Sequence, residues 1–343
     1  MAKKALALRV PVAAAESARK ALLAAALYDS SRLAARRRGF VYFPVLRPDP
    51  ELGRVLGASF VRVQLPRARP KQTLREALSH LLKPEQFALL RRAFDVIGDI
   101  AIIELPRPLA RKGTLIGRAL LKTQPGIKAV FAKASPRAGV FRLQRLRWLA
   151  GRKGTVTRHR ESSLTFELDI AKVYFSPRLA GERLRIARQV HSDERVLVMF
   201  SGVAPYPAVL SRWSGASQIV GVELNPVAHA YGLRNISLNK LTRIELYQGD
   251  VRRIVPALGL FDRIIMPLPF GGQHFLGLAL AAAAAGATVH FYIALPETKL
   301  NEAEALVQKA CAAAARRCTI LRVVRAGQPA PRTLRLCVDF RVL

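Results

Sequence analysis

The stretch Val196-Leu-Val-Met-Phe-Ser-Gly-Val-Ala-Pro-Tyr206 predicts a buried strand that runs directly into a tight turn of small residues. At the carboxyl edge of a parallel sheet, such a turn lets the backbone approach a bound cofactor. Glu223 ends the next predicted strand about twenty residues later, where a carboxylate can accept hydrogen bonds from both ribose hydroxyls. Asp250 follows the third strand and is placed to meet an adenine amino group. This order of features favours an adenosyl cofactor, and capping of helices or turns is the alternative role of the two acids.

Strands alternate with helices from Val173 to the C-terminus, a pattern typical of an α/β fold with a doubly wound parallel sheet. The strands of this part are predicted at 195–200, 218–223, 243–248, 262–266 and 288–294. A helix at 301–316 precedes two neighbouring strands, 319–325 and 334–342. This last pair predicts an antiparallel hairpin at the sheet edge, which is usual in AdoMet-dependent methyltransferases and unusual in dinucleotide-binding sheets.

The first half of the chain predicts two small α+β domains. Residues 1–66 form the first, with a helix at 16–28 and strands at 39–46 and 59–65. A basic, proline-flanked linker follows at 67–72. Residues 73–172 form the second domain, and residues 173–343 form the sheet domain. The elements expected in the second domain are helices at 74–82 and 113–123, a strand pair within 94–104, and strands at 129–133, 143–148 and 164–170.

The charge of the chain indicates a polyanionic partner. Lys and Arg number 56 and Asp and Glu 23, for a net charge of +33. Residues 1–172 contain 35 of the basic and 12 of the acidic side chains, so the docking surface is expected mainly in this half. An Arg-rich proteome or a high growth temperature is the alternative explanation. Three basic clusters are the candidate phosphate contacts: Arg36, Arg37 and Arg38; residues 67–71; and residues 152–160.

Several classes of protein have little support. Cys311, Cys318 and Cys337 are too few and too irregularly spaced for a disulfide framework or a metal knuckle, so we expect reduced cysteines in a cytoplasmic protein. The six histidines form no HxxH or HxxxH pair, and no metal site is expected. Arg9 and Pro11 cut short the apolar run of a signal peptide. Prolines and glycines interrupt the uncharged run 264–296, so no membrane association is expected.

The segment Ala171-Lys-Val-Tyr-Phe-Ser-Pro-Arg-Leu-Ala-Gly-Glu-Arg183 joins the two halves of the chain. It resembles the linker-to-catalytic-domain signature of the archaeal and eukaryotic tRNA (guanine-37 N1)-methyltransferases. Residues 94–104, 132–135 and 223–226 also look like segments of this family, so the similarity covers nearly the whole chain. The resemblance implies a C-terminal class I, Rossmann-like methyltransferase sheet preceded by two small RNA-binding or accessory domains.

The resemblance also implies S-adenosyl-L-methionine (AdoMet) as cofactor and tRNA as partner. The tRNA would be recognised through its anticodon stem-loop and its tertiary core, because such an enzyme must recognise folded shape as well as the target base. A monomer suffices for a large, rigid RNA partner. The residues expected at the cofactor follow the strand ends and the joining segment: Tyr174, Phe175, Phe200, Ser201, Gly202, Glu223, Leu224, Asp250 and Pro267.

Methyl transfer to N1 of guanine requires removal of the N1 proton and stabilisation of the negative charge that develops on O6. By resemblance Glu182 is the candidate base and Arg142 the candidate group at O6, with Arg145 as a substitute. Tyr174 and Phe175 are also able to stack on the flipped base, and Arg183 to position it. The alternative is that Glu182 and Arg183 only begin an amphipathic helix and that the arginines lie on a basic face.

Three positions depart from the family pattern. Pro267-Leu-Pro269 stands where the family usually has Asn-Leu-Pro, and the two prolines are candidate residues of the catalytic site. A similar Pro-Leu-Pro variant characterises an archaeal branch that methylates both guanine-37 N1 and C7 of 4-demethylwyosine, which gives isowyosine. Val198 replaces a usual Asp and predicts weaker or rearranged cofactor binding. Ala204 replaces a usual Gly, and the turn is expected to survive if its φ stays negative.

The sequence therefore predicts an AdoMet-dependent tRNA methyltransferase that acts at position 37. Two alternatives stay open. One is an aminocarboxypropyltransferase of the wyosine pathway, which fits the absence of an acid at Val198 and of Asn at Pro267. The other is a non-catalytic tRNA-binding protein with a decayed cofactor pocket.

Overall fold

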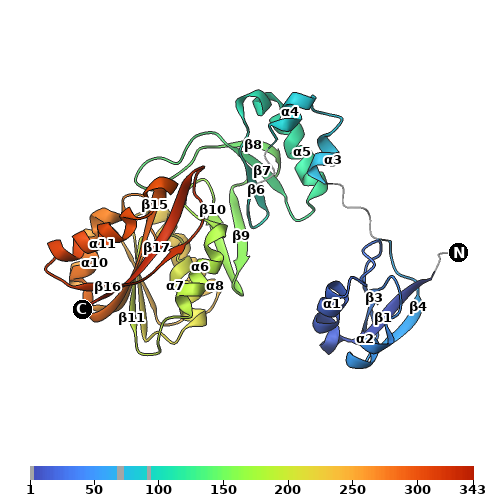
Figure 1. Ribbon diagram of the computed structural model, residues 1–343. Helices are drawn as coiled ribbons and strands as arrows, with labels where there is room; N and C mark the ends of the chain where they lie inside the picture. Colours follow the sequence, from blue (N-terminus) through green and yellow to red (C-terminus); the bar gives the residue numbers. More distant parts are fainter. Residues whose placement is uncertain (1–3, 68–72, 91–93) are drawn as a thin grey trace. The chain divides into compact units, whose positions relative to one another are not determined.

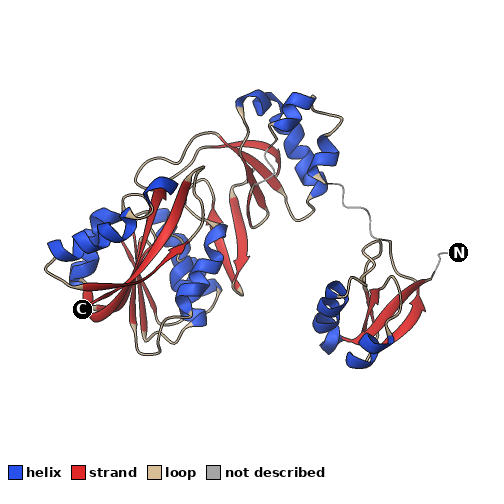
Figure 2. Ribbon diagram, viewed as in Figure 1, coloured by secondary structure: helices blue, strands red, loops and turns tan. Residues whose placement is uncertain are grey.

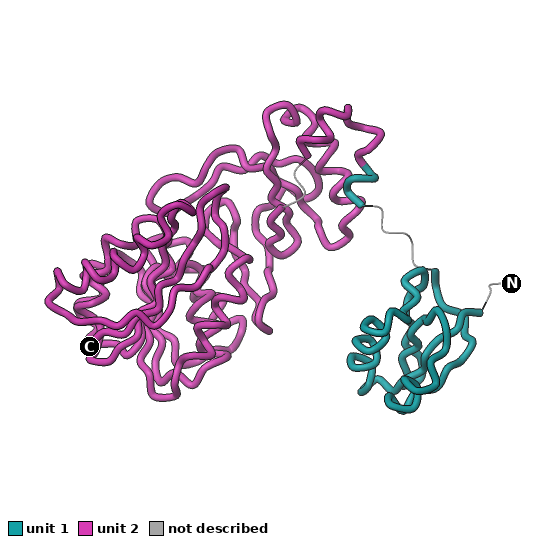
Figure 3. Tube along the Cα trace, in the orientation of Figure 1, with its two compact units in different colours: residues 1–77 teal, residues 78–343 magenta. Residues whose placement is uncertain are grey.

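The computed structural model describes residues 4–67, 73–90 and 94–343. The chain divides into two compact units, Met1–Ala77 and Leu78–Leu343 (Figure 3). The first unit thus extends past the predicted boundary at residue 66. Apart from Arg67, the predicted linker at 67–72 lies outside the described residues. Helix α3, Leu74–Leu78, contains the boundary between the units, which falls between Ala77 and Leu78.

The first unit is a four-stranded antiparallel sheet with the order β2-β3-β1-β4 (Figure 1). Its core contains Leu8, Leu22 and Phe43. Helix α2 begins where the Asp49 side chain accepts a hydrogen bond from the amide of Leu52 and Pro50 occupies the first turn. The strands are β1 (Ala5–Pro11), β2 (Ala35–Arg37), β3 (Phe40–Pro44) and β4 (Ser59–Val63), and the helices are η1 (Val12–Ala14), α1 (Ala15–Ala24) and α2 (Pro50–Val55).

The second unit begins with a small mixed sheet, β5-β6-β7-β8, on which helix α5 packs. Gly117 allows the close packing, because a Cβ there would lie 3.0 Å from the Cβ atoms of Leu149 and Ala150. A separate hairpin, β9 and β10, follows. The elements are α4 (Pro84–Ala88), β5 (Asp95–Ile97), β6 (Ile100–Ile103), η2 (Arg107–Lys112), α5 (Gly113–Thr123), β7 (Ala129–Lys133), β8 (Leu146–Gly151), β9 (Val156–Glu161) and β10 (Leu164–Asp169).

The rest of the second unit is a seven-stranded sheet with helices on both faces (Figure 2). The strand order is β13-β12-β11-β14-β15-β17-β16, and all neighbours are parallel except the two pairs that β17 makes. The strands are β11 (Arg195–Met199), β12 (Gln218–Glu223), β13 (Ile244–Gln248), β14 (Phe261–Met266), β15 (Ala283–Pro296), β16 (Cys318–Arg325) and β17 (Thr333–Val342). The doubly wound sheet and its terminal antiparallel hairpin are as predicted.

Two hydrophobic clusters cover the two faces of this sheet. Val196 and Val198 of β11 pack into one cluster, with residues of α6, α7 and α8, and Leu197 and Met199 pack into the other, with residues of α9, α10 and α11. This alternation follows from the pleat of a strand that is buried on both sides. The helices are η3 (Pro177–Leu179), α6 (Ala180–Ala187), α7 (Pro205–Trp213), α8 (Pro226–Leu238), α9 (Val251–Ile254), η4 (Val255–Ala257), η5 (Gly272–Phe275), α10 (Leu276–Ala281), η6 (Glu297–Lys299) and α11 (Glu302–Ala313).

The strand order reverses direction along the sequence between β11 and β14, because β12 and β13 lie on one side of β11 while β14 and β15 lie on the other. In an open α/β sheet, ligands bind at such a switch point, outside the carboxyl ends of the strands. Within the described residues, no helix is both long enough and apolar enough to cross a bilayer.

Candidate cofactor and substrate pocket

A cavity of about 840 Å³ opens at the carboxyl ends of β11, β12, β13 and β14. Its volume lies within the range of small-molecule sites, about 300–1,000 Å³. The turn after β11 lines one part, and the segment after β14 lines another. Residues 133–144 and 327–335 complete the wall. The cavity therefore brings together the features that the sequence analysis singled out at separate strand ends.

Glu223 holds the turn after β11. Its Oε2 accepts a hydrogen bond of 2.6 Å from the amide of Gly202, and its Oε1 accepts one of 2.8 Å from the amide of Asn225. Burial raises the pKa of Glu223 above its ordinary value, although amide donors from Asn225 and Gly202 oppose the shift. Each carboxylate oxygen keeps a lone pair for a further donor. Asn225, rather than Glu223, caps the following helix, α8.

Asp250 lines the cavity and also caps α9, a helix of four residues. It accepts a hydrogen bond of 2.9 Å from the amide of Arg252 and one of 3.0 Å from its Nε. These bonds hold the pKa of Asp250 below its ordinary value. The contacts of Asp250 in this structure are therefore those of a helix cap. Because Asp250 also lines the cavity, it can still accept a hydrogen bond from an adenine amino group.

The turn after β11, residues 200–204, contains three residues with positive φ: Phe200 and Gly202, both at 60°, and Ala204 at 62°. Phe200 lines the cavity and meets Phe275 edge-on, with the ring centroids 4.9 Å apart. The side chain of Ser201 is buried outside the cavity lining, while its amide donates to the carbonyl of Val222. Leu224 lines the cavity as an exposed residue.

The turn keeps its place although the condition of a negative φ at Ala204 is not met. Ala204 has φ 62° and ψ 36° and precedes Pro205, the first residue of α7. The chain needs this left-handed conformation to turn from β11 into the helix. An alanine in it costs about 1–2 kcal/mol, because its Cβ approaches the following carbonyl oxygen. The buried packing of Ala204 offsets this cost.

Aromatic rings and arginines form the opposite part of the cavity. Pro267 and Pro269 line it, as does Phe270 directly after them. The guanidinium of Arg142 lies 4.6 Å from the centre of the Phe270 ring. Arg142 has a positive φ of 54°, a conformation that costs free energy for a residue with a side chain.

The two aromatic residues of the joining segment both line the cavity but differ in burial. Tyr174 is half-buried, and the Arg137 guanidinium lies 4.4 Å from its ring centre. Phe175 is 4% exposed and packs against His159 and Phe166. Tyr174 is therefore the better placed of the two to stack on a ligand.

Four residues predicted at the cofactor or the target base do not line the cavity: Ser201, Glu182, Arg183 and Arg145. Glu182 accepts hydrogen bonds of 2.6 Å from both Arg185 and the hydroxyl of Tyr292. Arg145 is exposed. Glu182 and Arg145 therefore stay off the cavity wall, and the Arg183 guanidinium lies 5.3 Å from the centre of the Phe175 ring without lining the cavity itself.

Arg183 is only 2% exposed, and Glu161 occupies its guanidinium through two hydrogen bonds of 2.6 Å. A third bond, of 3.1 Å, runs to the carbonyl of Ser176. In this arrangement Arg183 cannot contact a base directly. Its hydrogen bonds to Glu161 instead connect the joining segment to β9.

The predicted phosphate contacts of the first unit are exposed. Arg36 and Arg37 belong to β2, and Arg38 follows in a turn with φ 47°. Arg37 donates a hydrogen bond of 3.0 Å to the carbonyl of Gln64. In the second unit, Arg158 and Arg160 lie exposed on β9. Residues 68–71 of the second cluster lie outside the described part of the chain.

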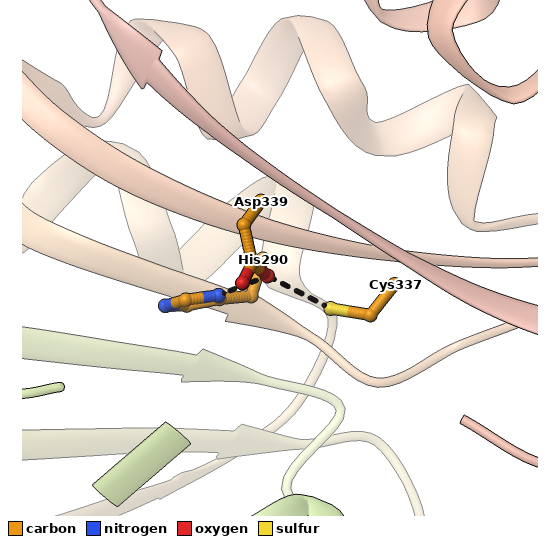
Figure 4. Close-up of side chains that lie close together, drawn as sticks. All are labelled: His290, Cys337 and Asp339. Carbon is orange, nitrogen blue, oxygen red and sulfur yellow. Dashed lines mark hydrogen bonds and ion pairs between the residues drawn. The ribbon is translucent and has the colours of Figure 1, made fainter. Parts of the chain in front are cut away.

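A buried polar cluster lies away from the cavity lining, on β15 and β17 (Figure 4). Asp339 accepts hydrogen bonds of 2.6 Å from Nδ1 of His290 and 3.1 Å from Cys337. Arg185 and Arg322 also donate to this carboxylate. Burial disfavours the charge of Asp339, but the His290 and Arg185 hydrogen bonds outweigh burial and lower its pKa. Because two arginines already neutralise the acid, the cluster does not favour a cation.

Comparison with known proteins shows to which family this chain belongs. Residues 157–321 match the TRM5/TYW2 methyltransferase domain, and residues 74–155 match the TYW2 N-terminal domain. The chain is 34% identical to the tRNA (guanine(37)-N(1))-methyltransferase Trm5b of Pyrococcus abyssi, over 98% of this chain and 99% of that one. This chain belongs to the TRM5/TYW2 methyltransferase family. The family predicted from the sequence is thereby confirmed.

Other members of the TRM5/TYW2 family have different activities or bound partners. The tRNA(Phe) (4-demethylwyosine(37)-C(7)) aminocarboxypropyltransferase of Pyrococcus horikoshii is 31% identical over 66% of this chain and 80% of that one. The complex structure of aTrm5 and tRNALeu matches with a TM-score of 0.71, 30% identity and 98% and 99% coverage. The structure of TYW2 from Pyrococcus horikoshii with MeSAdo matches with a TM-score of 0.67, 27% identity and 80% and 99% coverage.

Proposed function

We propose that this protein is an AdoMet-dependent tRNA methyltransferase that acts at position 37, with guanine N1 as its first target. One observation carries the proposal: a ribose-type carboxylate, Glu223, and an arginine–aromatic pair, Arg142 and Phe270, line the same cavity. Membership of the TRM5/TYW2 family and the full-length similarity to Trm5b support the tRNA substrate.

The residues at the ends of β11 and β12 fit an adenosyl cofactor. Gly202 offers open space, since a Cβ there would meet nothing closer than the carbonyl oxygen of Tyr174 at 3.9 Å. Glu223 is fixed by two backbone donors and can accept from the ribose hydroxyls. Asp250 would face the adenine, and Phe200 with Leu224 would bound it. When bound, AdoMet supplies an electrophilic methyl group on its sulfonium sulfur.

Arg142 is the group that would stabilise the target base. Loss of the N1 proton places negative charge on O6, and a guanidinium within hydrogen-bonding reach lowers the free energy of that state. The Phe270 ring beneath the guanidinium restricts its orientation, so less order has to be gained during the reaction. Pro267 and Pro269 would shape the wall beside the base without offering a side-chain donor.

Glu182 remains our candidate base, and this role requires its carboxylate to move from its present partners. Its carboxylate must leave the Tyr292 hydroxyl and reach the cavity, because it does not line the cavity in this structure. Arg145 would require a similar approach as a substitute for Arg142. We assign Arg183 no direct base contact, because its side chain is 2% exposed and Glu161 holds its Nε and Nη2.

The basic first half of the chain would bind the tRNA through its anticodon stem-loop and tertiary core, with the protein as a monomer. Arg36, Arg37 and Arg38 would contact phosphates, which position an RNA without reading its sequence. The exposed arginines of β9 would supply further phosphate contacts from the second unit.

Two variations on the chemistry remain. The first adds methylation of C7 of 4-demethylwyosine, for which Pro267-Leu-Pro269 would have to admit a tricyclic base. The second transfers the aminocarboxypropyl arm instead of the methyl group, which the similarity to the Pyrococcus horikoshii aminocarboxypropyltransferase favours.

Product mass separates these reactions. The protein would be incubated with AdoMet and either an unmodified tRNA transcript or a tRNA that carries 4-demethylwyosine, followed by digestion to nucleosides and mass analysis. Addition of a methyl group to guanosine supports the proposal, and a methyl on the tricyclic base adds the second activity. Addition of the much heavier aminocarboxypropyl group shows the alternative reaction.

A further inference from the structure

The cations of the cavity are unequally neutralised. Three of the Lys and Arg side chains that line it are paired with carboxylates: Lys133 with Glu104, Arg178 with Asp95, and Arg252 with Asp250. Three more have no carboxylate partner among the described residues: Arg137, Arg142 and Arg335. Arg137 and Arg142 lie over aromatic rings. Arg335 has neither kind of contact in the described part of the chain.

Arg335 is also the most buried of these three arginines. It is 6% exposed, and its Nε is buried without a hydrogen-bond partner. No hydrogen bond or ion pair of its guanidinium to any described residue is present, and only its backbone is bonded, to Ala326 and Gly327. An arginine stays protonated at any ordinary pH, and a charge without a partner in a mostly buried position is costly. Its terminal nitrogens are not among the buried atoms, so an anion on a ligand of the cavity can reach them.

The strand order places Arg335 on the substrate side of the cavity. It lies on β17, opposite Ala294 of β15, whose amide donates a hydrogen bond of 2.8 Å to the carbonyl of Pro269. Arg335 thus adjoins the segment that would border the target base. Glu223 lies on β12, four strand positions away, a separation of about 19 Å at the usual strand spacing.

We propose that Arg335 binds a backbone phosphate of the tRNA beside the target nucleotide. The inference rests on the proposed function, because it takes the cavity to receive a nucleotide of tRNA. The guanidinium fork matches the two free oxygens of a phosphodiester, and such charge-assisted pairs are frequently bidentate. A phosphate at this point fixes the strand while the base enters between Arg142 and the proline segment.

The test compares full-length variants in tRNA binding and in AdoMet binding. Arg335→Gln removes the charge and leaves a shorter, polar side chain. Arg341→Gln is the matched control, because Arg341 is exposed on the same strand and pairs with Thr288 near the opposite end of β15. Binding of an unmodified tRNA transcript would be measured over a series of salt concentrations, and binding of AdoMet would be measured separately.

We expect Arg335→Gln to weaken tRNA binding by roughly 10- to 100-fold, the usual effect of losing a charge-assisted hydrogen bond. The slope of log affinity against log salt should fall by about 0.7, the value for one single-strand phosphate. AdoMet affinity should stay at the wild-type value, and Arg341→Gln should leave both affinities unchanged. Arg335→Lys should keep the wild-type salt slope.

Two outcomes overturn the assignment. Loss of AdoMet affinity with unchanged tRNA affinity would show that the ligand is the carboxylate of the cofactor. Wild-type values for both ligands would show that Arg335 has no ligand. Should Arg335→Gln fail to fold, Arg335→Lys decides by the same comparison, since equal tRNA affinity would remove the need for the guanidinium fork. A wild-type protein that binds tRNA but transfers no methyl group contradicts the proposed function alone.

Discussion

Replacing Arg183 tests whether its pair with Glu161 serves tRNA binding or the stability of the fold. We expect Arg183→Met to destabilise the second unit strongly. Both side chains are nearly inaccessible, at 2% and 4% exposure, so the variant would leave the Glu161 carboxylate buried without its partner. Removal of one member of a buried pair costs about 3–5 kcal/mol. With about 2–4 °C per kcal/mol, Tm should fall by about 6–20 °C.

Thermal unfolding followed by calorimetry measures this fall, and the double variant Arg183→Met/Glu161→Met is its control. The double variant leaves no unpaired charge and should regain most of the lost stability. The effect should also depend on pH. Burial opposes the charge of Glu161, but bonds from His159 and Arg183 lower its pKa. The contribution is therefore present above the unfolded pKa, about 4.3, and is lost as the pH falls through the lowered folded pKa.

The opposite pattern would show the structural assignment of Arg183 to be wrong. An Arg183→Met protein with the wild-type Tm and a large loss of tRNA affinity would place the guanidinium on the RNA. Glu161 would then have to be stable in the core without its partner.

Three further predictions concern the cavity. Glu223→Ala should weaken AdoMet binding by about 3–6 kcal/mol, from two hydrogen bonds to a charged acceptor, while tRNA affinity in a filter-binding assay stays unchanged. Burial raises the pKa of Glu223, and the hydrogen bonds from the ribose require its ionised form. The AdoMet affinity of the wild-type protein should therefore fall as the pH is lowered through that pKa. Calorimetric titration at a series of pH values should find no such fall in Glu223→Gln. Arg142→Ala should lower kcat by about 10²–10³ with little change in AdoMet affinity, and Phe270→Leu should lower kcat by less, as single-turnover methylation would measure.

Much of the fold could be predicted because its signals are local. The strands β11, β12 and β14 are short apolar runs bounded by turn residues, and α5 was predicted at its observed bounds, Gly113–Thr123. The central strand of the first unit, β1, was missed because its alanines have weak strand propensity. Strand β9 was missed because arginines and His159 dominate its sequence.

The residues of the site could be predicted where their place at the end of a strand is enough to bring them to the cavity. Glu223 and Asp250 follow from their positions at strand ends, and the Asn-Pro pair after Glu223 carries the signal of a helix start, which would have identified Asn225 as a cap. The orientations of the Glu182 and Arg183 side chains do not follow from the positions of these residues in the sequence. Their partners, Tyr292 and Glu161, come from other elements, so no local pattern shows that both side chains turn inward.

Phe270 and Arg335 were missed for a similar reason. Phe270 directly follows the quoted proline segment, and its aromatic character beside a site motif is the signal that was overlooked. An arginine on a strand is expected at the surface from the sequence alone. The low exposure of Arg335 and its place at the cavity depend on the packing around β17, which no local pattern shows.

The most direct measurement is transfer of labelled methyl groups from AdoMet to a phenylalanine tRNA transcript with guanine at position 37, beside the same transcript with adenine there. We expect label only in the guanine transcript, recovered as 1-methylguanosine after nucleoside mass analysis. Tight tRNA binding without any methyl transfer to guanine would contradict the proposed activity and indicate either a wyosine-pathway enzyme that needs a pre-modified base or a binding protein.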